Sequence, residues 1–336
     1  MSDTSQKTTQ YLQYGGQAVI EGVMMRSPRF FAVACRKPDG GIVVQQEPLE
    51  RSIVGKLKWM NKPLLRGSLA LIDAMALGMK ALNFAANVQT KALEKPTTTE
   101  DGITVEPEKP SKISDIAVGA TMVFSICFGI GLFIALPTLL TQFVQGKIVS
   151  GSPTRLDQSI LNLVDGVIRI TIFLGYIAMI SRLENIRRVF QFHGAEHKAI
   201  NALEAKLPLT VENCMAASRI HPRCGTSFII VVLIASILVH SVFPRPEMYW
   251  QRLLLHIALI PIVAGIAFEV IKLAGKYKDV ALTRWLLAPG LWSQLLTTRE
   301  PDVEHLEVAI ASLEAVLNSE KEEDALKATS LATAPA

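Results

Sequence analysis

Two histidines and a glutamate, His193, Glu196 and His197, form the segment of the chain best suited to chemistry. The surrounding residues, Phe-His-Gly-Ala-Glu-His-Lys, predict a helix that continues to Ala205. In a helix, His193 and His197 lie one turn apart on the same face. Two imidazoles in that arrangement can bind one divalent metal ion, and a carboxylate beside them can take a proton from water. The spacing therefore predicts a metal site with Glu196 as catalytic base.

Further ligands are expected from the next histidine and cysteine along the chain. His221 and Cys224 are separated by two residues, and Pro222 and Gly225 favour a tight loop around them. Imidazole and thiolate are ligands that zinc prefers, although iron and manganese stay open. The predicted metal ligands are His193, His197, His221 and Cys224, and the expected cofactor is a divalent metal, with zinc as the first choice.

Each of these residues also has an ordinary structural interpretation. His193 and His197 can be surface residues of a helix whose charged neighbours form ion pairs, while His221 can be a loop residue and Cys224 a buried thiol. Against this, the chain has only six histidines in 336 residues, so the pattern rarely arises by chance. The H-x-x-E-H spacing also occurs in metallopeptidases.

Glu21 is a second candidate acid or base. It lies in the apolar run 14–50, which predicts strands with a hairpin turn at residues 38–41. Alternation along a strand would place Glu21 on one face, pointing into the metal site as a catalytic residue. The structural alternative is a carboxylate paired with Arg26 or Arg29.

The composition predicts an integral membrane protein. Half of the residues are hydrophobic, only 19% are charged, and the mean hydropathy is +0.32. Residues 116–146 contain no Asp, Glu, Lys or Arg, and about 20 apolar residues suffice to cross a bilayer as a helix. The expected fold class is a membrane α-helical protein with about four transmembrane helices, at residues 116–144, 159–181, 226–243 and 253–275.

Ionisable residues within the expected spans have two interpretations each. Glu269 is either a functional group in the membrane or a carboxylate paired with a nearby lysine. Asp165 and Arg169 are one helical turn apart in the favourable order, so a structural pair is expected. A structural role is also expected for His240 and His256.

Soluble-looking segments flank the membrane part. A small β/α region precedes it, whose helix over 63–90 is expected to be a core or interfacial helix or a fifth span, and an amphipathic helix follows it. In chain order the expected parts are a disordered N-terminus (1–13), a β-hairpin/helix region (14–90), a flexible linker (91–113), a membrane domain (114–300) with the metal-motif segment 182–224, the C-terminal amphipathic helix (301–320) and a disordered tail (321–336).

The distribution of Lys and Arg predicts an orientation. Segment 182–224 and the chain after the fourth span are rich in both, whereas the two opposite connections hold few. Both termini and segment 182–224 are therefore expected on the cytoplasmic side of a bacterial inner membrane or a thylakoid-type membrane. The net charge of +4, with no Lys/Arg cluster among aromatics, argues against nucleic acid as a partner.

Four separated motifs together resemble the YqhQ-like family, a bacterial and plastid-related group of membrane proteins described as predicted metal-dependent enzymes. The motifs are GGQAVIEGVMMRSP (15–28), HGAEHKAI (193–200), HPRCGTSF (221–228) and LLAPGLWSQLLTTREPD (286–302). The resemblance implies a multi-span membrane protein with a metal site at His193 and His197, together with His221 and Cys224. It implies no particular reaction.

Two function classes follow. The first is a metal-dependent membrane enzyme, a hydrolase acting at the cytoplasmic face on a lipid-like or membrane-peptide substrate. The second is a non-catalytic scaffold or assembly factor with a structural metal site, which contacts protein partners through its C-terminal helix. A transporter is disfavoured because the spans hold few polar residues and no matched pair of broken helices.

Overall fold

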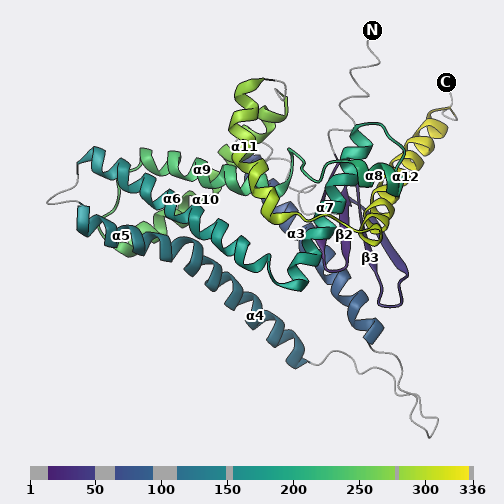
Figure 1. Cartoon of the computed structure of the whole chain (residues 1–336), viewed down its shortest axis with the longest axis horizontal. Helices are drawn as coiled ribbons and strands as arrows, with labels where there is room; N and C mark the ends of the chain where they lie inside the picture. Colours follow the sequence, from purple (N-terminus) through teal and green to yellow (C-terminus); the bar gives the residue numbers. More distant parts are fainter. Residues whose placement is uncertain (1–13, 50–64, 94–111, 149–153, 277–279, 333–336) are drawn as a thin grey trace, which may run out of the picture.

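The computed structural model describes residues 14–49, 65–93, 112–148, 154–276 and 280–332. Long helices form a bundle on one side of the molecule, and a small sheet wrapped by helices lies at one end of that bundle (Figure 1). The N-terminus predicted to be disordered, and most of the predicted linker, lie outside the described residues.

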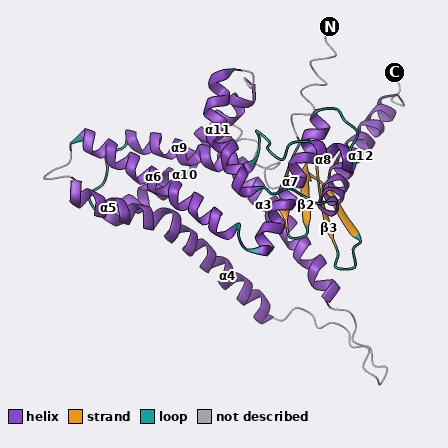
Figure 2. Cartoon of the chain, in the orientation of Figure 1, coloured by secondary structure: helices purple, strands orange, loops and turns teal. Residues whose placement is uncertain are grey.

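The sheet contains four antiparallel strands in the order β1-β2-β3-β4 (Figure 2). They are β1 (Gly15–Val19), β2 (Gly22–Arg26), β3 (Phe30–Arg36) and β4 (Ile42–Pro48). The predicted turn at residues 38–41 joins β3 to β4. An additional turn at Ile20 and Glu21 divides the first expected strand, and Glu21 adopts the left-handed conformation with a φ of 52°. The strand-face position predicted for Glu21 is therefore wrong, because this residue lies at a hairpin tip.

Helices cover both faces of the sheet. On one face, α7 (Glu184–Glu204), α8 (Val211–Ala216) and α12 (Val303–Ala332) form a core with alternate residues of β2 and β3. On the other face, the second half of α3 (Leu65–Leu93) packs on the remaining residues, with Leu77, Ala81 and Ala85 buried. Successive strand residues point to opposite faces, and this explains why β3, Phe-Phe-Ala-Val-Ala-Cys-Arg, is apolar over almost its whole length.

The bundle consists of α4 (Lys112–Ile130), the π-helical segment η3 (Gly131–Ala135), α5 (Leu136–Ile148), α6 (Arg155–Ile180), α9 (Gly225–Val242) and α10 (Tyr249–Lys276). Among the described residues, five helices are long and apolar enough to cross a membrane: Arg66–Thr90, Val123–Lys147, Arg155–Ile180, Gly225–Val242 and Tyr249–Leu273. All four expected spans are among them. By length and composition, α3 is a fifth candidate, the alternative that the sequence left open for residues 63–90, although its second half packs on the sheet.

The first half of α3 packs against α10. Gly67 lies so close to Gly265 that a Cβ at residue 67 would be 2.8 Å from the Gly265 Cα. Arg66 directly precedes Gly67, and Glu269 lies one turn after Gly265 on α10. The Arg66 guanidinium pairs with both carboxylate oxygens of Glu269. Glu269 thus binds an arginine of another helix, a partner that was not named from the sequence.

Two C-terminal helices differ from expectation. Residues 281–297 form α11 (Ala281–Thr297), for which no helix was predicted. Helix α12 does not end at residue 320 but continues to Ala332, through most of the segment predicted to be disordered. Arg29, in the turn between β2 and β3, pairs with Glu320 at the end of the predicted helix and with Asp324 in the first turn of the extension, the latter at 2.6 Å. These ion pairs attach the start of the extension to the sheet region.

Candidate metal centre

Helix α7 positions the two histidines and the glutamate of the first motif. The rings of His193 and His197 are 4.4 Å apart between centroids, as expected for residues one turn apart. Helix α7 can lie directly against the chain that follows α11, because a Cβ at Gly194 would overlap the carbonyl oxygen of Arg299. The Arg299 amide donates to the Phe190 carbonyl at 2.8 Å and fixes this contact.

The loop before α9 brings Cys224 to the same place. Cys224 is the N-cap of α9, and its Sγ lies 3.2 Å from Nε2 of His193. The buried amide of Gln294, on α11, holds the loop by accepting from the His221 N–H at 2.9 Å and donating to the His221 carbonyl at 2.7 Å. As a result, the candidate ligand atoms of His193, His197 and Cys224 all lie within 4.8 Å of one another.

Backbone carbonyls orient both imidazoles of α7. Nδ1 of His193 lies 2.8 Å from the Thr297 carbonyl oxygen, and Nδ1 of His197 lies 2.6 Å from that of Arg219. Nδ1 must carry the proton that each carbonyl accepts, which leaves the Nε2 lone pairs available. Nε2 of His197 is buried and makes no hydrogen bond of good geometry with any described residue. A free imidazole nitrogen beside a second imidazole and a thiol fits the ligand preferences of zinc.

Burial favours the neutral form of His197. It lowers the pKa of this imidazole, and the nearby Cys224 thiol and the Arg219 carbonyl partly oppose the effect. A neutral imidazole is the form that binds a metal ion, so the burial of His197 prepares it for that role near pH 7.

Glu196 lies beside Nε2 of both histidines. Its Oε2 is 3.9 Å from Nε2 of His193 and 3.7 Å from Nε2 of His197, and the residue is only 4% exposed. Burial raises the pKa of Glu196, while His193, His221 and a hydrogen bond from the Gly16 backbone oppose this. A carboxylate with a raised pKa next to a metal site is suited to accept and return a proton.

His221 lies next to this group but turns Nε2 elsewhere. Its ring is 5.7 Å from that of His197 between centroids, and its Nε2 is 3.3 Å from Oε1 of Glu204. Arg223 pairs with the same carboxylate. The structure thus brings together three of the four predicted ligands, with the fourth at the edge of the group, and the ligand role of all four stays a prediction.

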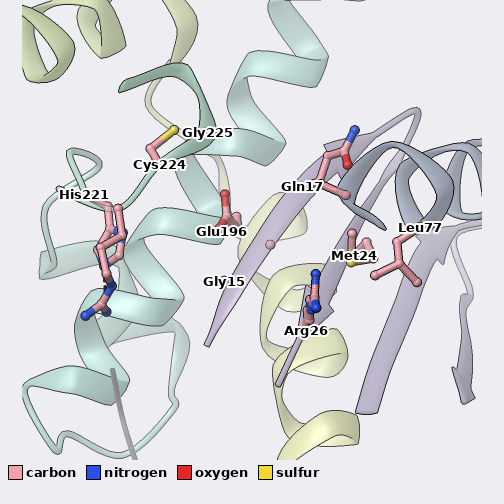
Figure 3. A pocket seen from close by; sticks show the side chains of 12 residues that line it. Gly15, Gln17, Met24, Arg26, Leu77, Glu196, His221, Cys224 and Gly225 are labelled. Carbon is pink, nitrogen blue, oxygen red and sulfur yellow. Dashed lines mark hydrogen bonds between the residues drawn. The ribbon is translucent and has the colours of Figure 1, made fainter. Parts of the chain in front are cut away.

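A cavity of about 200 Å³ opens next to the metal group. Glu196, His221 and Cys224 line one side, and residues of β1, β2 and α3, among them Gln17 and Leu77, line the other (Figure 3). The sheet and α3 therefore form a wall of the candidate site and leave a hollow beside the carboxylate of Glu196.

Glu21 is not among the residues that line this cavity. Its carboxylate pairs with Arg188 of α7, with Oε2 2.7 Å from Nη2, and Arg188 also binds Glu304 of α12 at 2.8 Å. The sequence-based alternative, an ion pair, had named Arg26 or Arg29 as the partner. Those two arginines bind Asp73 and Glu320 instead, because the turn at residues 20–21 carries Glu21 to α7.

Several residues that support the site were missed by sequence reasoning. Gly16 lies against Glu196, Gln294 holds the His221 loop, and the carbonyls of Arg219 and Thr297 orient the histidines. Gly16 and Gln294 lie within two of the four motifs, so their position there was the available signal. Every residue has a backbone carbonyl, so the residue types at positions 219 and 297 do not indicate that their carbonyls orient the histidines.

Comparisons with known proteins find one family model and a bacterial relative that match most of the chain. A family model described as a protein of unknown function, DUF1385, matches residues 62–319. The chain belongs to the DUF1385 family. It is also similar to a Bacillus subtilis (strain 168) protein described as "Uncharacterized protein YqhQ", with 38% identity over 309 residues that cover 91% of this chain and 93% of that protein.

These matches confirm the YqhQ-like resemblance predicted from the four motifs. The DUF1385 match includes α3, α7, α9 and most of α12, and with them all four predicted metal ligands. No solved structure matches the chain.

Proposed function

We propose that this DUF1385 protein is a metal-dependent membrane enzyme, a hydrolase that acts on a membrane-associated substrate. The observation that carries the proposal is the buried carboxylate of Glu196, less than 4 Å from two imidazole nitrogens and open to a cavity. Three protein ligands with a nearby acid or base are typical of catalytic zinc sites, whereas structural sites have four ligands.

In this proposal His193, His197 and Cys224 hold the metal, zinc being the first choice. Zinc bound there would polarise a carbonyl or phosphoryl group and acidify water. Glu196 takes a proton at its carboxylate and later returns it to the leaving group. The Gly16 amide hydrogen-bonds that carboxylate and keeps it oriented, and Gln294 keeps the Cys224 loop in place.

The substrate class follows from where the site lies. Cys224 immediately precedes α9, so the site is at one end of a candidate span, next to the sheet. Trp285 and Trp292 of α11 are 83% and 69% exposed, and tryptophan is enriched at membrane–water interfaces. We infer a lipid-like or membrane-peptide substrate at the membrane surface, and the Lys/Arg distribution favours the cytoplasmic side.

Metal analysis of the detergent-purified protein tests the ligand set. We expect about one zinc per chain in the wild type, no zinc in His193→Ala, and unchanged zinc in Glu196→Gln, since three protein ligands define one catalytic site. Circular dichroism checks that each variant is folded. A folded wild-type protein that takes up no divalent metal when it is added would overturn the proposal.

Cobalt substitution tests whether the site can accept a substrate. Cobalt(II) bound to Cys224 gives a thiolate charge-transfer band, and this band should be absent in Cys224→Ser. A hydroxamate, which binds metal ions at open positions, should change the visible spectrum of the cobalt protein. An unchanged spectrum at saturating hydroxamate would contradict catalysis by this site.

The second function, a scaffold with a structural metal, is favoured by one observation. His221 is buried and its ring lies next to that of His197, so it could complete a closed site of four ligands. In that case hydroxamate has no effect, His221→Ala loses the metal, and chelation unfolds the segment between α7 and α9.

A further inference from the structure

A second cluster of polar residues lies inside the bundle, at the end far from the sheet. Asp165 and Arg169 of α6 pair at 2.8 Å, and Nε2 of His256 lies 3.4 Å from the same carboxylate. His256 stacks on His240 with ring centroids 4.1 Å apart. Asp165, Arg169 and His240 are all less than 9% exposed, which is costly within a membrane unless their charges are balanced.

Two arginines add positive charge to this cluster without a matching carboxylate. Arg245 donates to the side-chain oxygen of Asn162, and Arg252 donates to the carbonyls of Pro246 and Glu247. All three acceptors are neutral. Burial and the neighbouring Arg252 lower the pKa of Arg245 to about 10, so it remains a cation at neutral pH. Among the described residues of the cluster, three arginines face one aspartate.

Unused hydrogen-bonding atoms point to a missing partner. Nη1 of Arg252, Nε and Nη2 of Arg245 and Nε2 of His240 are buried and have no hydrogen-bond partner among the described residues. Arg252 and His240 are only 5% and 8% exposed. Nδ1 of His240 donates to the Ser236 carbonyl at 2.7 Å, so its free Nε2 is an acceptor. Free donors on two arginines and a free acceptor on a histidine suit an anion that carries a hydroxyl group.

An apolar cavity of about 250 Å³ leads away from this cluster. It is lined by Arg169, His240 and His256 at one end and by apolar residues such as Phe228, Val232 and Val263 along its length. From His240 to Phe228 it follows α9 for about 18 Å, similar to the depth of one leaflet of a bilayer. Two further hollows share His240 and His256, and each has a volume of only about 10 Å³. A head group therefore enters the hollow lined by Arg245 and Arg252 only if these two side chains move apart.

We propose that this part of the bundle binds one anionic lipid, with a phosphate-bearing head at Arg245, Arg252 and His240 and an acyl chain in the apolar cavity along α9. The head supplies the negative charge that the cluster lacks, and a hydroxyl or a monoprotonated phosphate donates to His240. This site is distinct from the metal centre, and its existence does not rest on the proposed enzyme activity.

Native mass spectrometry and thermal unfolding of the full-length protein in a neutral detergent test the proposal. Oleoyl lysophosphatidate should bind one per chain and raise the unfolding temperature, whereas oleoyl lysophosphatidylcholine, whose head has no net charge, should do neither. Inorganic phosphate should have much less effect than the lysophosphatidate. Equal effects of the two lysolipids would overturn the proposal, and so would a full effect of phosphate alone.

Point variants test the part of the site that binds the head group and the part that binds the acyl chain separately. Arg252→Gln should weaken lysophosphatidate binding by about ten- to a hundredfold, the usual cost of losing hydrogen bonds to a charged group. Val232→Phe fills the apolar cavity and should weaken binding of the lysolipid without touching an arginine. Arg155→Gln removes an exposed charge from the start of α6 and should change nothing.

Binding that is unchanged in both Arg252→Gln and Val232→Phe would overturn the proposal. His193→Ala should bind the lysolipid as the wild type does. A loss of lipid binding in this metal-site variant would contradict the independence of the two sites. Because Val232→Phe leaves every polar contact of the cluster intact, it keeps the test valid if the arginine variant does not fold.

Discussion

At the scale of single residues, the candidate metal centre depends on which nitrogen of each histidine is left without a hydrogen bond to the backbone. The carbonyls of Thr297 and Arg219 occupy Nδ1 of both histidines, so only Nε2 remains for a metal. The sequence motif predicts that His193 and His197 share a helix face, because helical geometry alone decides this. It could not predict the tautomer, because the two carbonyls come from segments far along the chain.

Gly16 is the residue whose size should matter most at the site. A Cβ at this position would lie 2.6 Å from the Met24 carbonyl oxygen and 2.8 Å from Cγ of Glu196. We expect Gly16→Ala to reduce the free energy of unfolding by about 1–3 kcal/mol, as overpacking does, and to displace the Glu196 carboxylate. Thermal unfolding and zinc titration measure the two effects. The neighbouring Gly15→Ala is a matched control, since nothing lies within 4 Å of the added atom.

Removal of the His221 ring distinguishes a supporting residue from a ligand. Because its Nε2 lies against Glu204, we expect His221→Gln to keep the zinc with an affinity lowered by about 10- to 100-fold, as for residues that support a metal site. His197→Gln should abolish zinc binding. Isothermal titration of the metal-free proteins makes the comparison, and equal losses in the two variants would show that His221 is a ligand.

At the scale of elements, the sequence predicted those helices and turns that depend on hydrophobic periodicity and local composition. Helices at the four expected spans and the turn between β3 and β4 are present because apolar runs and a Pro-Asp-Gly-Gly turn act locally. The turn at Ile20 and Glu21 was missed because it has no Gly or Pro at its centre. Helix α11 was missed because Pro289 and Gly290 lie in its middle, where both residues usually disfavour a helix.

Gln294 allows α11 to be tested as a support for the metal loop. Its amide makes two hydrogen bonds to the His221 backbone and one to Ser227, all buried. Gln294→Leu leaves these groups without partners, at about 1–3 kcal/mol each before relaxation. We expect weaker zinc binding, measured by competition with a chelator, although Gln294 is no ligand. Gln191→Leu is the control, because this half-buried residue of α7 makes a hydrogen bond to Asp302 at the surface and none to the His221 loop.

At the scale of the whole molecule, the sheet and the polar cluster of the bundle lie at opposite ends of the membrane helices. The sheet packs against α7, α12 and the second half of α3, whereas the loop between α9 and α10 adjoins the far end of α6 through Arg245 and Asn162. The proposed metal enzyme and the proposed lipid site would therefore lie on different sides of the membrane.

Cysteine labelling in intact cells tests this arrangement. Cys127 is exposed and the other three cysteines are buried, so Cys127→Ala gives a background with little reactivity. In that background, an impermeant maleimide should label Glu247→Cys in intact cells and Asp39→Cys only after lysis, because the Lys/Arg distribution favours a cytoplasmic sheet. Labelling of Asp39→Cys in intact cells would contradict the predicted orientation.

The core on one face of the sheet joins the two ends of the chain, and this has a consequence for synthesis. The Ser312 hydroxyl of α12 donates to the Ala32 carbonyl of β3, across 280 residues of sequence. At a translation rate of about 5–20 residues per second, the strands wait roughly 15 to 60 s for their covering helix. During this time the apolar face of β2 and β3 needs protection by a chaperone or the membrane. Thr297, which orients His193, is also made after the last candidate span, so a nascent chain cannot complete its candidate metal centre until all of these helices have been synthesised.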